Sequence, residues 1–242
     1  MLVLRSLAFN IAFYVNLVLW LVAILPTIVL PRRALIAAVK GWGRSNLILM
    51  RIIVGTRMEV RGKERIPKGA LLVAAKHQSF WETFALLHLF DDPCYILKRE
   101  LMWIPFFGWY LRKARMIPVD RGARSAAMKA MNLAAEHEIE AGRQILIFPE
   151  GTRVEVGAAP DYKPGIAALY RDLECPCVPM ATNSGVHWPA HGFRRFPGTV
   201  VYEFLPAIPA GLKRAEFMAL LEERIEGASD AMLAAEVRPA LS

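Results

Sequence analysis

The hydrophobic pattern of the chain begins with a long uncharged run, since residues 7 to 30 contain no Asp, Glu, Lys or Arg. At about 1.5 Å per residue, a helix of that length exceeds the thickness of a hydrocarbon core. A cleaved signal peptide, the alternative, has an apolar region of only about 7–15 residues. The run therefore predicts a retained helix that enters the bilayer. Asn16, Pro26 and positive charge on both sides leave open whether it spans the membrane or inserts halfway.

A basic stripe characterises the stretch that follows. At about 100° per residue, four cations fall within roughly 40° of one another on a helical wheel. They are Arg33, Lys40, Arg44 and Arg51. Apolar residues occupy the remaining face, which is typical of a helix at a membrane interface with its cations toward anionic head groups. The alternative is the solvated face of an ordinary helix, and Gly41 and Gly43 weaken any helix here.

From about residue 58 onward, short apolar runs alternate with helical patterns. The expected strands are 71–75, 94–97, 115–119, 144–148, 178–182 and 199–205, and the expected helices are 79–90, 100–113, 124–141, 164–172 and 213–235. Such alternation predicts an α/β fold with a mostly parallel sheet flanked by helices. We therefore expect two parts, membrane-associated N-terminal helices over residues 1–57 and an α/β domain over residues 58–242.

The composition is basic and hydrophobic. The chain of 242 residues carries 30 Lys and Arg against 22 Asp and Glu, a net charge of +8. That charge suits nucleic acid, a phosphorylated substrate or an anionic membrane. A hydrophobic share of 55% favours the membrane, and without a Lys/Arg-rich tail or zinc-finger spacing we expect no nucleic-acid partner. Three cysteines do not make a disulfide framework, which fits a reducing, cytoplasmic setting.

Four polar motifs stand where predicted strands stop. They are "KHQSFWET" after strand 71–75, "IPVDR" at 117–121, "FPEGTR" at 148–153 and "VPMATNSG" at 178–185. In sheets of this kind, binding sites gather beyond the carboxyl ends of the strands. The motifs are therefore candidates for one common site.

This set and order of motifs resembles the glycerolipid acyltransferases, specifically the 1-acylglycerol-3-phosphate (lysophosphatidic acid) acyltransferases. The family pattern is His-x4-Asp, a block ending in Asp-Arg or Arg-Arg, then Phe-Pro-Glu-Gly-Thr-Arg and an apolar Val-Pro block. The resemblance runs from about Val73 to Gly185. The departure is Glu82, which stands where most members carry Asp.

The chemistry of acyl transfer to an alcohol needs a base near the operating pH, and the histidine side chain suits that task. His77 is the expected base, and Glu82 is the carboxylate expected to orient its ring and stabilise the imidazolium. The local letters also allow another interpretation. Ser79-x-x-Glu82 is a capping box, in which Glu82 would only satisfy backbone N–H groups of a helix.

The resemblance assigns substrate binding to residues that end the second and third motifs. Arg121 and Arg153 are expected to bind the acceptor phosphate, because the planar guanidinium fits phosphate oxygens. Glu150, Gly151 and Thr152 would shape the loop, with Gly151 letting backbone N–H groups approach the thioester oxyanion. Two further cations in similar places, Lys98 and Lys163, would add to the positive field. The alternative for the arginines is surface solubility.

We therefore expect direct transfer of a fatty acyl group from acyl-CoA or acyl carrier protein to the 2-hydroxyl of lysophosphatidic acid, forming phosphatidic acid. No metal or further cofactor is expected, and the chain has no Gly-x-Ser-x-Gly elbow for a covalent route. The expected setting is a membrane of phospholipids, with the active site on the cytoplasmic face. The alternatives are acylation of another lysolipid or glycerol 3-phosphate, and an inactive membrane-surface protein that binds anionic lipid.

Overall fold

The strands of this protein form one seven-stranded mixed sheet in a computed structural model that describes residues 1–120 and 124–237. The strands are β1 (Thr56–Arg61), β2 (Leu71–Ala75), β3 (Pro93–Lys98), β4 (Ile117–Val119), β5 (Gln144–Ile147), β6 (Cys177–Thr182) and β7 (Gly198–Phe204). Their order is β1-β7-β6-β2-β5-β3-β4. The five strands from β6 to β4 are parallel, whereas β7 is antiparallel to β6 and pairs in parallel with β1. The predicted mostly parallel α/β fold is confirmed.

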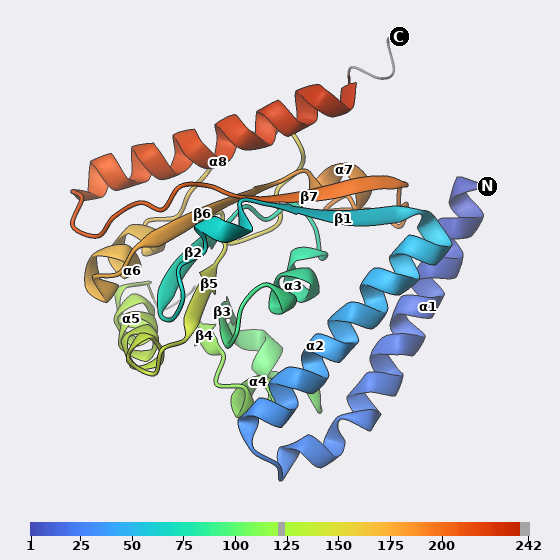
Figure 1. The fold of residues 1–242 in the computed structure, drawn as a ribbon. Coiled ribbons are helices and arrows are strands. Elements are labelled where there is room, and N and C mark those ends of the chain that lie inside the picture. The colour runs from blue at the N-terminus through green and yellow to red at the C-terminus, as the bar shows by residue number, and fades with distance from the viewer. Residues whose placement is uncertain (121–123, 238–242) are drawn as a thin grey trace.

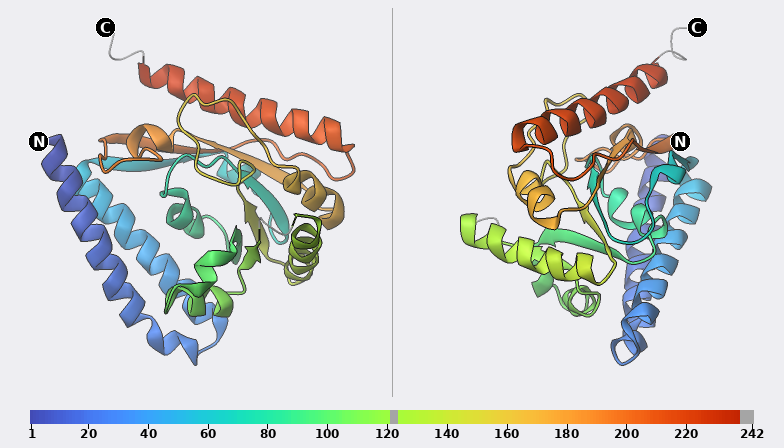
Figure 2. Two further views of the ribbon diagram at one scale, coloured as in Figure 1. Left: turned by 180° about the vertical axis from the view of Figure 1, so that it is seen from behind. Right: turned by 60° about the vertical axis from the view of Figure 1, so that its left-hand side comes forward.

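Helices cover both faces of the sheet (Figure 1). They are α1 (Leu2–Ala23), α2 (Arg32–Leu49), α3 (Glu82–Ala85), α4 (Phe107–Lys113), α5 (Arg124–Glu140), α6 (Gly165–Leu173), α7 (Ser184–His187) and α8 (Arg214–Val237). Because successive strand residues point to opposite faces, Leu71 and Val73 join the core under α1 to α4. Leu72 and Ala74 join the core under α5, α6 and α8. Figure 2 shows these two layers from behind and from the side.

The uncharged N-terminal run forms most of α1 and the turn of a helical hairpin, whose second helix is α2. The first helix ends at Ala23, a 3-10 turn over Leu25–Ile28 carries Pro26, and α2 then returns beside α1 (Figure 1). The polar Asn16 is accommodated because its amide donates to Ser45 and Asn46 of α2, at 2.8 and 3.0 Å. The neighbouring helix α2 therefore provides hydrogen-bond partners for a polar residue inside the apolar helix α1.

Helix α1 is largely uncovered by the rest of the protein. Its 22 residues include an 18-residue window of mean hydropathy 1.8, long and apolar enough to cross a membrane. A core helix would pass the same test, but only 17% of that window is buried. The helix contributes Phe9 and Phe13 to the core and exposes most of its other apolar side chains, which is consistent with membrane association.

The basic stripe is only partly a surface feature. Arg33, Arg44 and Arg51 are exposed, as an interfacial stripe requires. The Lys40 ammonium instead donates to the backbone oxygens of Phe90 and Asp91, at 2.7 and 3.0 Å. This cation therefore ties α2 to the end of the segment that follows α3.

Two predicted helices are shorter than expected, and each has a local cause. The helix expected over 79–90 begins only at Glu82, because the Ser79 hydroxyl accepts the Trp81 N–H at 2.8 Å and holds a turn there. The helix expected over 100–113 is split before α4. Pro105 disfavours helical backbone at the preceding residue, and Phe106 adopts a φ of 61°.

Strand β1 was not predicted from the pattern. Its residues "TRMEVR" alternate between buried or half-buried and exposed positions at one edge of the sheet. The strand also crosses the expected boundary at residue 57, and α1 and α2 share a hydrophobic core with the sheet. The other strands lie within two residues of their expected bounds.

Candidate active site

His77 lies directly beyond β2, next to the loop that leaves the adjacent parallel strand β5. Its ring stacks on Phe148 with centroids 3.9 Å apart and an interplanar angle of 13°. The His77 N–H donates to Glu150 Oε2 at 3.3 Å, and the His77 carbonyl accepts the Val154 N–H at 2.8 Å. The third motif therefore holds both the ring and the backbone of His77, as expected for two motifs at neighbouring strand ends.

The Glu82 carboxylate contacts both the His77 ring and the Ser79 backbone. Its Oε2 lies 3.3 Å from His77 Nδ1 and accepts the Ser79 N–H at 3.1 Å. The Glu82 side chain is fully buried, whereas that of His77 is 13% exposed. Because Nδ1 faces the carboxylate, Nε2 is the ring nitrogen left for a substrate hydroxyl. The extra methylene of glutamate does not prevent the pairing.

Ser184 completes the surroundings of this carboxylate and was not predicted as a site residue. Its hydroxyl hydrogen-bonds to Glu82 Oε1, across 102 positions of sequence. The Tyr95 hydroxyl donates to the backbone oxygen of Glu82 at 3.1 Å. Both Glu82 oxygens are thereby engaged. The only sequence signal for Ser184 was its position at the end of the fourth motif, where β6 stops.

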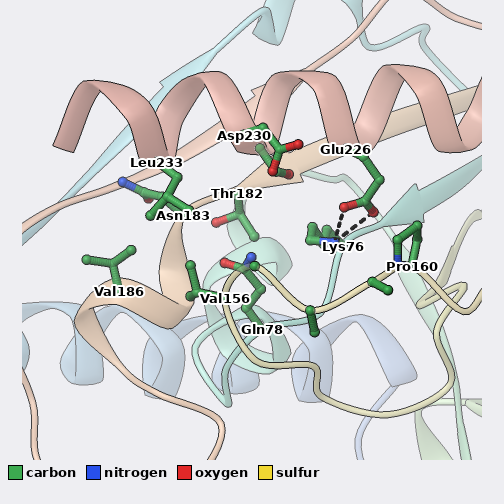
Figure 3. Close-up of a pocket in the computed structure, with 14 residues that line it drawn as sticks. Lys76, Gln78, Val156, Pro160, Thr182, Asn183, Val186, Glu226, Asp230 and Leu233 are labelled. Atoms are coloured by element: carbon green, nitrogen blue, oxygen red, sulfur yellow. Dashed lines mark hydrogen bonds and ion pairs between the residues drawn. The ribbon is translucent and has the colours of Figure 1, made fainter. Parts of the chain in front are cut away.

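An ionic cluster centred on the buried Lys76, the residue before His77, lies beside α8 (Figure 3). Both Glu226 oxygens lie 2.7 Å from the Lys76 ammonium, and Lys76 also contacts Glu150 Oε1 at 3.4 Å. The Tyr162 hydroxyl donates to Glu226 at 2.7 Å. Burial raises the pKa of Glu150 to about 7, although the nearby Lys76 opposes this shift. Glu150 therefore links the cluster to the His77 backbone, a position that its motif alone did not reveal.

A cavity of about 200 Å³ adjoins this cluster. The loop 156–160, α8 and the ends of β2 and β6 enclose it, with Lys76 and Glu226 at one side (Figure 3). Its lining mixes polar side chains such as Asn183 and Asp230 with apolar ones such as Leu233.

The structure describes three of the four cationic residues expected to bind substrate, namely Arg153, Lys98 and Lys163. Arg121 lies outside the described residues. Arg153 and Thr152 are exposed on the loop beside His77. Two exposed lysines also pair with neighbouring carboxylates, Lys98 with Glu100 at 3.8 Å and Lys163 with Asp161.

Gly151 adopts a φ of +68°, the left-handed region that glycine tolerates. Its N–H donates to the Phe148 carbonyl at 2.9 Å. This amide is therefore engaged in a turn, and the idea that Gly151 lets other backbone N–H groups approach an oxyanion stays a prediction.

Comparisons with known proteins identify the family of this chain. A sequence profile of the family described as "Acyltransferase" matches residues 57–183, slightly more than half of the chain. The chain belongs to this family. The matched segment of this acyltransferase begins near the start of β1 and includes His77, Glu82 and the Phe148–Arg153 loop.

Named relatives cover most of this acyltransferase. It is 38% identical over 202 residues to the 1-acyl-sn-glycerol-3-phosphate acyltransferase of Pseudomonas aeruginosa, covering 83% of this chain and 78% of that protein. It is 28% identical over 225 residues to 1-acyl-sn-glycerol-3-phosphate acyltransferase alpha of Ovis aries, covering 88% and 76%. Its fold matches the crystal structure of the LPA acyltransferase PlsC from Thermotoga maritima, with a TM-score of 0.79, 21% identity, and coverage of 97% and 98%.

Proposed function

We propose that this acyltransferase moves a fatty acyl group to the 2-hydroxyl of lysophosphatidic acid and forms phosphatidic acid. The observation that carries the proposal is the buried His77–Glu82 pair, 3.3 Å apart, held by the family motif next to it. The names of the relatives support the same acceptor. The pair offers a base where an alcohol must be deprotonated.

The proposed reaction is a direct displacement. The acceptor hydroxyl gives its proton to His77 Nε2 while its oxygen attacks the thioester carbonyl carbon. The carbon–sulfur bond then breaks, and the departing sulfur takes the proton from the His77 imidazolium. Glu82 stabilises that imidazolium through Nδ1, and Ser184 and the Ser79 N–H keep the carboxylate in place.

The acyl donor in this proposal is the thioester of acyl-CoA or acyl carrier protein, with no metal or other cofactor. Arg153 and Arg121 would bind the acceptor phosphate, and Lys98 and Lys163 would strengthen the local positive field. Glu150, Gly151 and Thr152 would form the wall of the acceptor site, since their loop lies against His77.

We place this reaction at a membrane, with the active site on the cytoplasmic face. The uncovered apolar helix α1 supports the membrane setting. The free cysteines, Cys94, Cys175 and Cys177, are compatible with a reducing compartment. A lipid acceptor could then reach His77 without leaving the membrane, while a soluble thioester approaches from the cytoplasm.

The decisive test mixes membranes with lysophosphatidic acid and a labelled acyl donor, either acyl-CoA or acyl carrier protein. The native protein should form phosphatidic acid, and His77→Ala should lose at least about a hundredfold in rate. Equal product from both proteins would contradict the enzymatic function and favour a lipid-binding protein. A panel of lysolipids and glycerol 3-phosphate would test the acceptor. A clear preference for a phosphate-free acceptor would contradict phosphate binding by Arg121 and Arg153.

A further inference from the structure

Arg195 is a buried cation that lacks an acidic partner. Its residue is 7% exposed, and no ion pair of the described residues includes it. One nitrogen, Nη1, donates to the carbonyls of Gly192 and Arg194 at 3.1 and 2.8 Å. The buried Nε has no hydrogen-bond partner within residues 1–120 and 124–237. An uncompensated buried charge is costly, so its retention calls for an explanation beyond stability.

The guanidinium of Arg195 lies close to the candidate active site. It covers the ring of Trp188 with its carbon 4.3 Å from the centroid. Trp188 is one turn from Ser184, whose carbonyl accepts the Trp188 N–H at 2.8 Å and whose hydroxyl bonds Glu82. A short chain of contacts therefore connects Arg195 to the catalytic pair.

Arg153 lies on the loop that contacts His77. It precedes Val154, whose N–H bonds the His77 carbonyl at 2.8 Å. Burial, with a smaller contribution from the charge of Arg153, lowers the pKa of Arg195 to about 10. Arg153 lies on the loop bonded to His77, and Arg195 is joined to Glu82 through Trp188 and Ser184. Both cations therefore suit an anionic ligand beside the candidate base.

The loop that carries Arg195 is fastened to the exposed apolar helix α1. The Arg195 N–H donates to the Ser6 hydroxyl at 2.9 Å, and that hydroxyl lies 3.3 Å from the Arg195 carbonyl. Asn10 donates to the Phe193 carbonyl at 2.8 Å. Arg195 is thus held at the point where the apolar helix meets the candidate site, which is where the head group of a membrane-bound acceptor would arrive.

We propose that Arg195, together with Arg153, binds the phosphate monoester of the lipid acceptor and determines the preference for it. The inference rests on the proposed function and adds to it a phosphate-binding residue that lies outside the four motifs. The planar guanidinium suits phosphate oxygens, and its second terminal nitrogen, Nη2, makes no hydrogen bond among the described residues. Trp188 keeps the plane in position before the substrate binds.

The test compares Arg195→Met with Arg194→Met, since Arg194 is the adjacent exposed arginine. Loss of a charge-assisted hydrogen bond should raise KM for lysophosphatidic acid roughly tenfold to a hundredfold in Arg195→Met, with a small change in kcat. Arg194→Met should retain the native KM. Glycerol 3-phosphate, a soluble phosphate monoester, should compete with the acceptor in the native protein and about tenfold more weakly in Arg195→Met.

Two outcomes would overturn the proposal. Equal rises of KM in both variants would show only a loss of general surface charge. The other outcome is that both variants bind phosphatidylglycerol vesicles equally more weakly than the native protein, while glycerol 3-phosphate competes as well as before. Arg195 would then bind anionic lipid in general and not the phosphate of the acceptor. If Arg195→Met does not fold, Arg195→Lys supplies the same test, because lysine keeps the positive charge but lacks the planar guanidinium. A native KM for lysophosphatidic acid in that variant would refute the proposal.

A binding measurement separates this proposal from the proposed function. Lysophosphatidic acid in micelles is titrated into His77→Ala and into His77→Ala/Arg195→Met, so no turnover is required. Weaker binding by the double variant supports the phosphate site even if the native protein transfers acyl groups to another acceptor. Equal binding refutes the site whether or not the native protein is active.

Discussion

Both carboxylate oxygens of Glu226 lie 2.7 Å from the ammonium of Lys76, 150 positions earlier in the chain. Lys76 is held more closely by Glu226 than by Glu150, whose nearest contact is 3.4 Å. Glu150 therefore keeps its second oxygen on the His77 N–H. Helix α8, which lies outside the matched family segment, thereby supports the backbone of the candidate base.

Breaking this pair should destabilise the protein and slow acyl transfer. Glu226→Gln should cost about 3 kcal/mol in the free energy of unfolding, because it leaves the buried Lys76 with a weaker partner. The double variant Lys76→Met/Glu226→Leu should regain most of that stability. Its kcat should remain roughly tenfold to a hundredfold low, because Glu150 has lost the cation that orients it.

The matched control is Glu223→Gln, an exposed carboxylate on the same helix. It should behave as the native protein in both urea unfolding and steady-state kinetics. Recovery of full kcat in the double variant would show that the pair serves stability alone.

The hydrogen bonds of Glu82 predict a graded response to substitution. Glu82→Gln keeps an oxygen acceptor for the Ser79 N–H but removes the charge opposite the imidazolium, so kcat should fall roughly a hundredfold or more. Ser184→Ala should lower kcat about tenfold, since it removes one hydrogen bond to a charged group. Ser229→Ala is the matched control, a buried serine whose hydroxyl has no partner among the described residues. Near-native activity of Glu82→Gln would leave Glu82 only the structural role of accepting the Ser79 N–H.

The raised pKa of Glu150 predicts how stability varies with pH. Burial moves this pKa from 4.5 to about 7 in the folded protein. Between those values the folded state binds one more proton than the unfolded state, so the free energy of unfolding falls as pH rises. The slope is up to about 1.4 kcal/mol per pH unit and vanishes above about pH 7.

The measurement is the difference between native protein and Glu150→Gln in denaturant unfolding from about pH 5 to 8. A difference is needed because burial lowers the pKa of His88 to about 4, which gives the opposite slope between pH 4 and 6.5. Glutamine does not titrate, so the stability advantage of the native protein over the variant should shrink with rising pH. A difference that stays constant would contradict the assignment.

Phe13 joins the N-terminal hairpin to the layer that carries the site. Its ring lies 5.6 Å from Trp188 and 5.7 Å from Phe80, and the residue is 6% exposed. Phe13→Ala should therefore reduce the free energy of unfolding by about 3–5 kcal/mol in detergent micelles. Val15→Ala, on the exposed side of α1, should change it by less than about 0.5 kcal/mol. Equal effects would mean that the hairpin does not pack on the domain as described.

The acyltransferase motifs could be predicted from sequence because each is local. Short apolar runs reveal buried strands, and a polar motif after such a run lies at the end of a strand. His77 and the Phe148–Arg153 loop were found in this way, and the parallel pairing of β2 and β5 then brings them together. Strand β1 was missed because every second residue is charged, so no continuous apolar run marks it.

Sequence alone determined most of the strand and helix pattern of the domain, the apolar first helix and the identity of the candidate base. It did not decide whether Glu82 caps a turn or pairs with His77, because both roles use the same letters. In the tertiary structure one oxygen of Glu82, Oε2, contacts both His77 Nδ1 and the Ser79 N–H. It also supplies Ser184, Glu226 and Arg195, whose partners stand on strands and helices far away in the chain. Contacts of that kind depend on how the sheet orders its strands, and no local pattern of residues records that order.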